Sequence, residues 1–186
     1  MAGFNICGTG GGFGSTFPKA NMETRRKYRW VFEDLSTPGG FKFAPNELLI
    51  LQSAQRPNFK FEEPELHHQQ EVAYFAGKQS WEPITMTWYD AENPDVSQAL
   101  ERWFNSVVDW TTANVNPPEE YKGTALLAMV NGFGKRTEEW TLCNCWPKSG
   151  NWGDLNYTDT EIATIECEMR YDRAKKTAFA GAENQP

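Results

Sequence analysis

The sequence lacks the long apolar run that a membrane-spanning helix requires. No stretch of its 186 residues approaches the roughly 18 consecutive apolar residues that cross a bilayer. Residues 1–15 carry no basic residue ahead of their first apolar ones, which excludes a secretory signal peptide. We therefore expect a protein that has no membrane partner and stays in the cytoplasm until something else carries it out.

The sequence also has no excess of positive charge. Lys and Arg number 18 against 25 Asp and Glu, which gives a formal net charge of −7. Proteins that grip nucleic acid hold the phosphates with clustered Lys and Arg, so the composition argues against such a protein. An acidic surface would let DNA slide past without sticking, but the same charge also keeps an ordinary protein soluble. Composition alone favours the second interpretation.

Histidine and cysteine are scarce, and their spacing excludes the usual metal sites. Cys143 and Cys145 form a C-x-C pair where zinc sites use C-x2-C, and only His67 and His68 remain to complete a set of ligands. Neighbouring histidines on a strand point to opposite faces, so we expect no metal. With two histidines and no nucleophile in a recognisable turn, we also expect no cofactor and no enzyme activity.

The two ends of the chain differ in composition from its middle. Residues 1–26 are rich in glycine without the G-x-G-x-x-G spacing of a phosphate loop, and predict a flexible arm. Residues 177–186 are small and polar and predict a loose tail. We expect one folded domain over residues 27–176.

Aromatic residues and short alternating runs are abundant. Aromatics make up 14% of the chain and suit half-buried sheet surfaces and interfaces. Apolar and polar residues alternate over 28–33, 84–89, 136–146 and 163–171, which predicts strands. Leu48–Gln52 and 124–131 predict two more strands, and 55–70 predicts an extended loop or ragged hairpin. The pattern is typical of a mainly β, antiparallel sheet protein.

One helix is predicted, over about residues 94–112. Asn93 is suited to cap it, Pro94 fits its first turn, and Asp95 favours the positive end of the helix dipole. Its apolar residues recur at steps of three and four and form one broad stripe that we expect to pack on the sheet. The residues expected to make this packing include Leu100, Trp103, Phe104 and Val107.

The last two predicted strands can be placed in register through their apolar faces. Matching these faces puts Trp140 opposite Cys167 and Leu142 opposite Ile165. A slip of one residue would expose every core residue, so the pattern predicts this register.

The same register brings three glutamates together on the polar face. Glu139 lies opposite Glu168, with Glu166 beside them. Like charges directly opposite each other destabilise a sheet unless water screens them. We therefore expect a wet, acidic face, which suits either a channel wall or an ordinary outer surface.

The register also separates the cysteines. Cys167 is expected on the core face, and Cys143 and Cys145 on the polar face, so no disulfide is expected between the two faces of one subunit. The cysteines either stay reduced as small hydrophobic residues, or Cys143 and Cys145 pair with Cys7 or a neighbouring subunit outside the cell.

Several segments follow one another in a distinctive order over residues 27–175. They are Lys27–Phe32, Glu71–Lys78, Ile84–Asp90 with the helix around Trp103, Trp140–Leu142, Cys145–Pro147, Leu155–Tyr157 and Ile162–Arg173. Together they resemble the tail tube protein family of contractile phages and related injection machines. The glycine-rich start, the stretch 53–70 and the cysteines depart from the pattern of that family.

The resemblance implies a β-sandwich or barrel subunit with one flanking helix and a structural role. Six copies would close into a ring whose inner strands form a ring-wide β-barrel, which removes unpaired sheet edges. Stacked rings would form the tail tube that conducts DNA into the host cell. A ring of six copies at −7 would carry a net charge of about −42, so with this resemblance we interpret the charge as that of an acidic lumen.

The resemblance also implies partners and a location. The partners would be further copies of the chain, a sheath protein outside, and baseplate, tube-initiator and terminator proteins, with DNA passing without sequence-specific binding. The location would be the virion tail, after assembly in the cytoplasm of a bacterial host. Two alternatives stay open: the tube of a protein-delivering contractile injection or secretion system, and a carbohydrate-binding β-sandwich that uses exposed tryptophans.

Overall fold

The computed structural model describes residues 25–158 and 160–178. Cys7 and most of the predicted N-terminal arm and C-terminal tail lie outside these residues. None of the helices in the described ranges has the length and apolar character needed to span a membrane.

In chain order the elements are β1 (Trp30–Ser36), α1 (Pro45–Leu49), β2 (Leu51–Ala54), β3 (Phe59–Phe61), β4 (Glu65–His68), β5 (Glu71–Tyr74), β6 (Gln79–Trp81), β7 (Ile84–Tyr89), α2 (Val96–Val107), α3 (Pro118–Tyr121), β8 (Gly123–Val130), β9 (Arg136–Asn151), β10 (Thr164–Arg170) and β11 (Arg173–Ala178).

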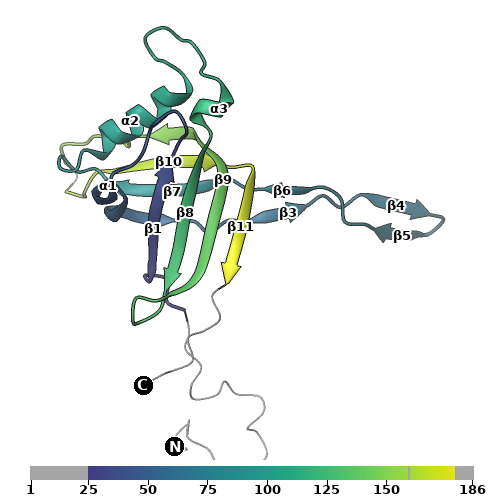
Figure 1. Cartoon of the computed structure of the whole chain (residues 1–186). Coiled ribbons are helices and arrows are strands. Elements are labelled where there is room, and N and C mark those ends of the chain that lie inside the picture. The colour runs from purple at the N-terminus through teal and green to yellow at the C-terminus, as the bar shows by residue number, and fades with distance from the viewer. Residues whose placement is uncertain (1–24, 159, 179–186) are drawn as a thin grey trace, which may run out of the picture.

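Seven strands form two layers that share the long strand β9 (Figure 1). The first half of β9 pairs with β8 and β11, and β1 pairs with β8. The second half of β9 pairs with β10, followed by β7 and β2. All these pairings are antiparallel, which confirms the predicted mainly β, antiparallel fold. We call these two layers together with α2 the body.

The apolar faces of the body were predictable from alternation. Met169 of β10 and Met86 and Trp88 of β7 are fully buried. They form one core with residues of the other layer, such as Leu35 and Leu142. The predicted strands 84–89 and 163–171 are therefore confirmed as half-buried strands.

The predicted register between the last strands is wrong. Trp140 lies opposite Leu127 and Lys176, whereas Cys167 lies opposite Gly150. The prediction ended the strand at residue 146, but β9 continues to Asn151. Pro147 fits there because the β9–β10 register shifts next to it, and proline is tolerated in strands at such irregularities.

A second irregularity lies in the middle of β9. Gly123 pairs with Cys145 and Thr124 pairs with Cys143, so Asn144 is an extra residue and has φ of 59°. Such a bulge reverses the faces on which the following side chains lie. Cys145 therefore packs in the core, and its prediction as a polar-face residue is wrong.

The main helix is shorter than predicted, and two short helices accompany it. Asp95 caps α2, because its carboxylate accepts a hydrogen bond of 2.9 Å from the Gln98 N–H, so Asn93 is not the cap. Leu100 and Trp103 are fully buried as predicted, and Phe104 and Val107 are half-buried.

Phe104 of α2 packs where the second layer makes room for it. A Cβ atom at Gly150 would lie 2.9 Å from the Phe104 ring, so glycine is needed at this contact. The Phe104 ring also lies 5.9 Å from the ring of Trp152. The sequence could not link these residues, because they are far apart along the chain.

The strand predicted at Leu48–Gln52 is partly wrong. Leu48 belongs to α1, and β2 begins at Leu51. Pro45 starts this helix, and the Glu47 carboxylate accepts a hydrogen bond of 2.7 Å from the Ala44 N–H. Local capping therefore overrides the apolar run.

The stretch between β2 and β7 forms a two-part hairpin, which is longer than the hairpin considered for residues 55–70, because the strands in that range pair with residues 71–81. β3 pairs with β6 near the body and β4 pairs with β5 farther out. We call residues 58–82 the arm; it projects past β11, on the side of the body away from β1 (Figure 1).

Candidate assembly surfaces

The arm is fixed to the body at its base. The Tyr171 hydroxyl donates a hydrogen bond of 3.4 Å to the Asn58 carbonyl, and the Tyr171 ring lies 5.8 Å from the ring of Trp81. Burial raises the pKa of Tyr171 to about 12, which keeps this hydroxyl protonated as a donor. Trp81 also contacts Phe59, with ring centroids 5.2 Å apart.

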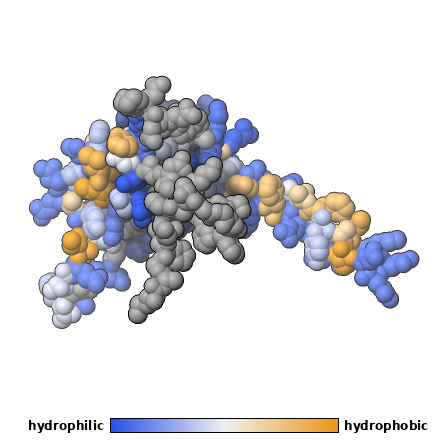
Figure 2. Space-filling model, turned by 90° about the horizontal axis from the view of Figure 1, so that it is seen from below, coloured by the Kyte–Doolittle hydropathy of each residue, from blue (hydrophilic) through white to orange (hydrophobic). Residues whose placement is uncertain are grey.

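Beyond its base the arm exposes large apolar side chains. Figure 2 shows them between the body and the polar tip of the arm. Contiguous exposed apolar surface marks a site of association, and a two-stranded hairpin is only marginally stable alone. The exposed residues are Phe59, Phe61, Leu66, Val72, Tyr74 and Phe75.

The arm also carries unbalanced negative charge. Glu65 lies 3.3 Å from His67, and Glu82 lies 3.5 Å from Lys60. In the described parts of the chain, Glu62 and Glu63 are exposed and form no ion pair. The arm therefore combines an apolar surface with free carboxylates.

A groove opens between the outer strands of the two layers, and we call it the seam groove. It consists of two open cavities of about 390 and 470 Å³ that share Lys27, Trp30 and Gln52. Within the described ranges, β8 is the only strand partner of β1 and β7 the only one of β2, and apart from a bridge between Ser36 and Lys42 both outer edges are unpaired. Apolar side chains line the groove, including Trp30, Val31, Leu49, Leu51, Leu127 and Met129.

Positive charge gathers at one end of the seam groove. Its lining includes Arg25, Arg26, Lys27 and Arg56. The surface is therefore basic on a chain whose net charge is −7. Composition could not reveal this patch, because it joins residues that precede β1 to a residue that follows β2.

A buried carboxylate lies beside this basic end. Glu138 is 1% exposed and contacts the Arg25 guanidinium, while Lys176 Nζ lies 3.3 Å and the Arg56 guanidinium 3.9 Å from it. The Trp140 indole also donates to it at 2.5 Å. Burial acts to raise the pKa of Glu138, but the Trp140 and Lys176 hydrogen bonds outweigh it and hold the pKa below its usual range.

Glu138 therefore joins four segments that are distant in sequence: the start of the described chain, the residues that follow β2, β9 and β11. Our sequence reasoning missed it. The signal was an acidic residue on the same strand face as Trp140 and Leu142, where alternation predicts a core residue.

The structure does not bring the three predicted wet-face glutamates together. Glu139 lies opposite Ala128 and Thr177 in one layer, so its predicted position opposite Glu168 is wrong. Glu168 lies in the other layer, opposite Thr85 and Ser149, and Glu166 is exposed two residues before it.

Two of these glutamates are neutralised locally. The Arg136 guanidinium lies 2.9 Å from Glu139 and 2.6 Å from Glu33. The Lys148 ammonium lies 2.9 Å from Glu168, and its hydrogen bond lowers the pKa of that carboxyl. The physical reason that the predicted cluster is absent is the length of β9, which puts the two layers on different halves of one strand.

The cysteines occupy different environments. Cys145 and Cys167 are buried; burial raises the pKa of both thiols, that of Cys167 to about 12. Cys143 is half-buried and lies opposite Thr124 and Arg173. These three thiols are free in the structure, and pairing with Cys7 stays a prediction because Cys7 lies outside the described residues.

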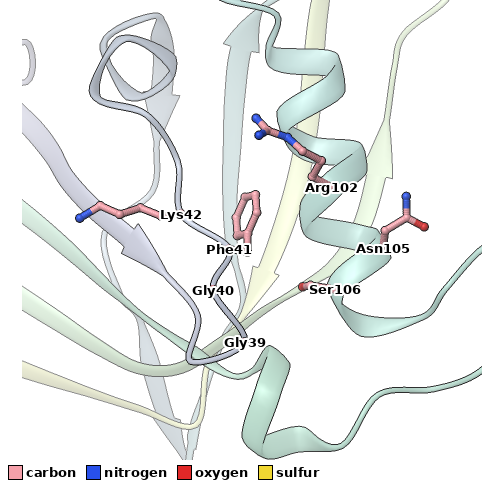
Figure 3. Close-up of a pocket in the computed structure, with 7 residues that line it drawn as sticks. All are labelled: Gly39, Gly40, Phe41, Lys42, Arg102, Asn105 and Ser106. Atoms are coloured by element: carbon pink, nitrogen blue, oxygen red, sulfur yellow. The ribbon is translucent and has the colours of Figure 1, made fainter.

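A third cavity lies between the loop at 39–42 and α2, and has about 490 Å³ (Figure 3). Its cations are already paired: Lys42 lies 3.1 Å from Asp34, and Arg102 lies 3.2 Å from Glu47. The Ser106 hydroxyl donates to the Trp103 carbonyl at 2.6 Å. In the described chain this hydroxyl donates to a backbone carbonyl and not to a base that would activate it as a nucleophile.

No cluster of three or more potential metal ligands occurs in the parts of the chain that the structure describes. The surfaces that stand out in this part of the chain are the apolar acidic arm, the apolar basic groove, and the strand edges without strand partners.

The sequence matches the phage tail tube protein family over residues 19–176. The chain belongs to this family. The match includes all strands of the body except the last two residues of β11, and the whole arm. No curated protein matches the sequence.

Solved structures show the same tail tube fold. A chain of the anti-feeding prophage cap, which terminates the tube, has 17% identity and a TM-score of 0.66, covering 89% of this chain and 98% of that chain. A chain of the sheath–tube complex of the extracellular contractile injection system PVC in its extended state has 17% identity and a TM-score of 0.60, covering 90% and 96%. A chain of the six-fold symmetrised anti-feeding prophage baseplate has 13% identity and a TM-score of 0.64, covering 84% and 98%.

Proposed function

We propose that this tail tube protein forms homohexameric rings, and that stacked rings conduct DNA into the host cell. The observation that carries this proposal is the open sandwich. In the described chain, the outer edges of β1, β2 and β11 have no strand partner. Unpaired edges attract other strands, and closure into a ring covers them with identical copies.

The contacts between copies are of the kind that builds a filament. The seam groove and the arm are different surfaces of one subunit. A contact between two different surfaces of one protein joins the copies head to tail. If the rotation from one copy to the next does not close a ring, the copies form a filament. The symmetry of the similar baseplate structure supports six copies in a ring.

The partners and place of action follow from the same proposal. The protein is a structural component of the tail, without enzyme activity, and assembles in the cytoplasm of a bacterial host. A sheath surrounds the tube, and baseplate and terminator proteins cover its ends. The similar chains from a tube-terminating cap and a sheath–tube complex support these partners. The net charge of −7 suits DNA that passes without binding.

A second candidate changes the cargo and keeps the tube. The similarity to chains of an extracellular contractile injection system supports a tube that delivers protein. Tubes isolated from complete particles separate the two cases: nucleic acid inside them supports the first function, and protein alone supports the second.

Electron microscopy of the purified protein in negative stain tests the proposal. We expect hollow tubes or six-membered rings. A monomer whose tryptophan fluorescence shifts with saccharide would instead favour a carbohydrate-binding sandwich, for which the exposed Trp110 would be a platform. A monomer without such a response contradicts both.

A further inference from the structure

Three exposed cations precede β1 and border the seam groove. Arg25, Arg26 and Lys27 line the groove together with apolar residues of β8, and their backbone belongs to no strand. In the described chain, the ion pair that ties these three residues to the body is the one between Arg25 and Glu138. We call residues 25–27 the strap, because this contact holds them beside the groove.

Glu138 has more cationic neighbours than one carboxylate needs. Lys176 Nζ lies 3.3 Å from its Oε2 atom, and the Arg25 guanidinium contacts the same oxygen. Lys176 also lies over the Trp140 ring, 5.3 Å from its centroid, so β11 keeps this cation in place. A buried carboxylate without a cation is costly, but Glu138 retains Lys176 when Arg25 leaves. The strap can therefore detach without leaving the buried charge unpaired.

Arg56 lies close enough to replace Arg25. Its guanidinium is 3.9 Å from Oε1 of Glu138, which is too far for a hydrogen bond, and it donates instead to the Met129 sulfur at 3.7 Å. A thioether is a weak acceptor, whereas a carboxylate accepts about four hydrogen bonds. The charges of Arg25 and Arg56 repel each other, so the loss of Arg25 favours a closer approach of Arg56 to Glu138.

This replacement needs movement of side chains alone at Arg56. The Gln55 N–H donates to the Thr85 carbonyl at 3.1 Å, and Pro57 is buried. The backbone on either side of Arg56 is therefore fixed to the body. The side chains of Arg25 and Arg56 are about half-exposed, so both have room to rotate.

We propose that the strap opens when Arg25 leaves Glu138 and Arg56 takes its place. The two arginines compete for one carboxylate, and the difference in their affinities sets the fraction of molecules with an open strap. Opening removes residues 25–27 from the lining of the seam groove and uncovers part of its apolar floor. The inference does not rest on the proposed tube, because the strap, the carboxylate and the groove belong to one chain.

Digestion of the dilute protein with trypsin tests this competition. Trypsin cleaves after Arg and Lys, and the cleavage rate of a locally opened segment follows the population of the open state. Mass spectrometry gives the rates of cleavage after Arg26 and Lys27. Each rate is divided by that of the same bond in a synthetic peptide of the same sequence. Cleavage after Arg170, in β10, reports unfolding of the body in the same samples.

Removal of the two arginines is expected to have opposite effects on cleavage in the strap. Arg25→Gln removes a charge-assisted hydrogen bond at a half-exposed site and should raise the rate about three- to tenfold. Arg56→Gln removes the competitor and should lower the rate about two- to threefold. When Arg25→Gln is already present, adding Arg56→Gln should have no effect, because the competition has ended.

Arg102→Gln is the matched control. Arg102 is as exposed as Arg25 and pairs with another buried carboxylate, that of Glu47, at 3.2 Å. Its replacement removes the same charge away from Glu138 and should leave the cleavage rate in the strap unchanged.

Three results would overturn the proposal. An unchanged rate in Arg25→Gln would show that Glu138 does not hold the strap. A rate that rises or stays the same in Arg56→Gln would show that the two arginines do not compete. A rise after Arg26 that only matches the rise after Arg170 would show general unfolding in place of a separate opening of the strap.

Discussion

The body and the arm of this tail tube protein use their aromatic residues in opposite ways. Trp88 and Trp103 in the body are completely buried, whereas Phe61 and Tyr74 in the arm are exposed. Burial of each large side chain contributes about 2–3 kcal/mol to folding, so the body is stabilised by its own sequence. The arm gains this energy only when another molecule covers it. A single chain therefore suffices to fold the body, whereas the proposed role of the arm requires a second copy.

The largest effect on stability is expected in the body. Trp103→Ala removes a completely buried ring that lies 5.5 Å from Phe43, and should lower the free energy of unfolding by about 3–5 kcal/mol. Chemical denaturation measures this change. Because the Trp103 indole N–H has no hydrogen-bond partner among the described residues, Trp103→Phe removes an unsatisfied group and should cost less than half as much as Trp103→Ala. An equal loss of unfolding free energy in the two variants would show that this N–H has a hydrogen-bond partner.

A smaller effect is expected at Glu138, beside the basic end of the seam groove. Glu138→Gln leaves Arg25 and Lys176 without their buried counter-charge, and should cost about 1–3 kcal/mol at neutral pH. The cations are half-exposed, so solvent limits the loss.

The effect of Glu138 should depend on pH. Its pKa in the folded protein lies below the ordinary value of 4.5, so its stabilisation is complete above about pH 4.5 and is lost as the pH falls through the lowered pKa. Unfolding measured from pH 7 to pH 3 should show the unchanged protein and the variant converging in acid. A difference between them that stays constant over this range would contradict the role of the ionised carboxylate.

In the arm, loss of two exposed aromatic residues should leave the free energy of unfolding almost unchanged and still prevent assembly. Phe61→Ser with Tyr74→Ser should change the free energy of unfolding by less than about 0.5 kcal/mol, because both side chains are exposed. The same variant should remain unassembled in sedimentation. Assembly at the level of the unchanged protein would show that the exposed aromatics of the arm make no contact between copies.

The smallest effect is expected at the cysteines. Cys143 is half-buried, so a thiol reagent should label it in the folded protein, while Cys145 and Cys167 should react only after unfolding. Burial raises the pKa of both buried thiols and so removes the reactive thiolate. Mass spectrometry of labelled peptides gives the order of reaction. Early labelling of Cys145 would contradict its place in the core.

The sequence predicted the body better than it predicted the surfaces. Alternation is a local signal, and it identified the buried faces of β7 and β10, just as periodicity identified the buried Leu100 and Trp103 of α2. The length of β9 was missed because Pro147 and Gly150 are typical of loops. Only the pairing with β10, a partner distant in sequence, shows that these residues lie in a strand.

The assembly surfaces could not be predicted, because long-range pairing creates them. The bulge at Asn144 inverts the pattern that put Cys145 on the polar face. β11 was not predicted as a strand, and its last two residues were assigned to the tail, yet it supplies Lys176 to Glu138. The seam groove joins the residues before β1 to those after β2, and no local pattern relates them.

Sedimentation velocity of the purified protein over a range of concentrations tests the central claim most directly. The account predicts that a 21.2 kDa species gives way to rings and long tubes as the concentration rises, and that Phe61→Ser with Tyr74→Ser keeps the small species. A single 21.2 kDa species at every concentration of the unchanged protein would contradict the account.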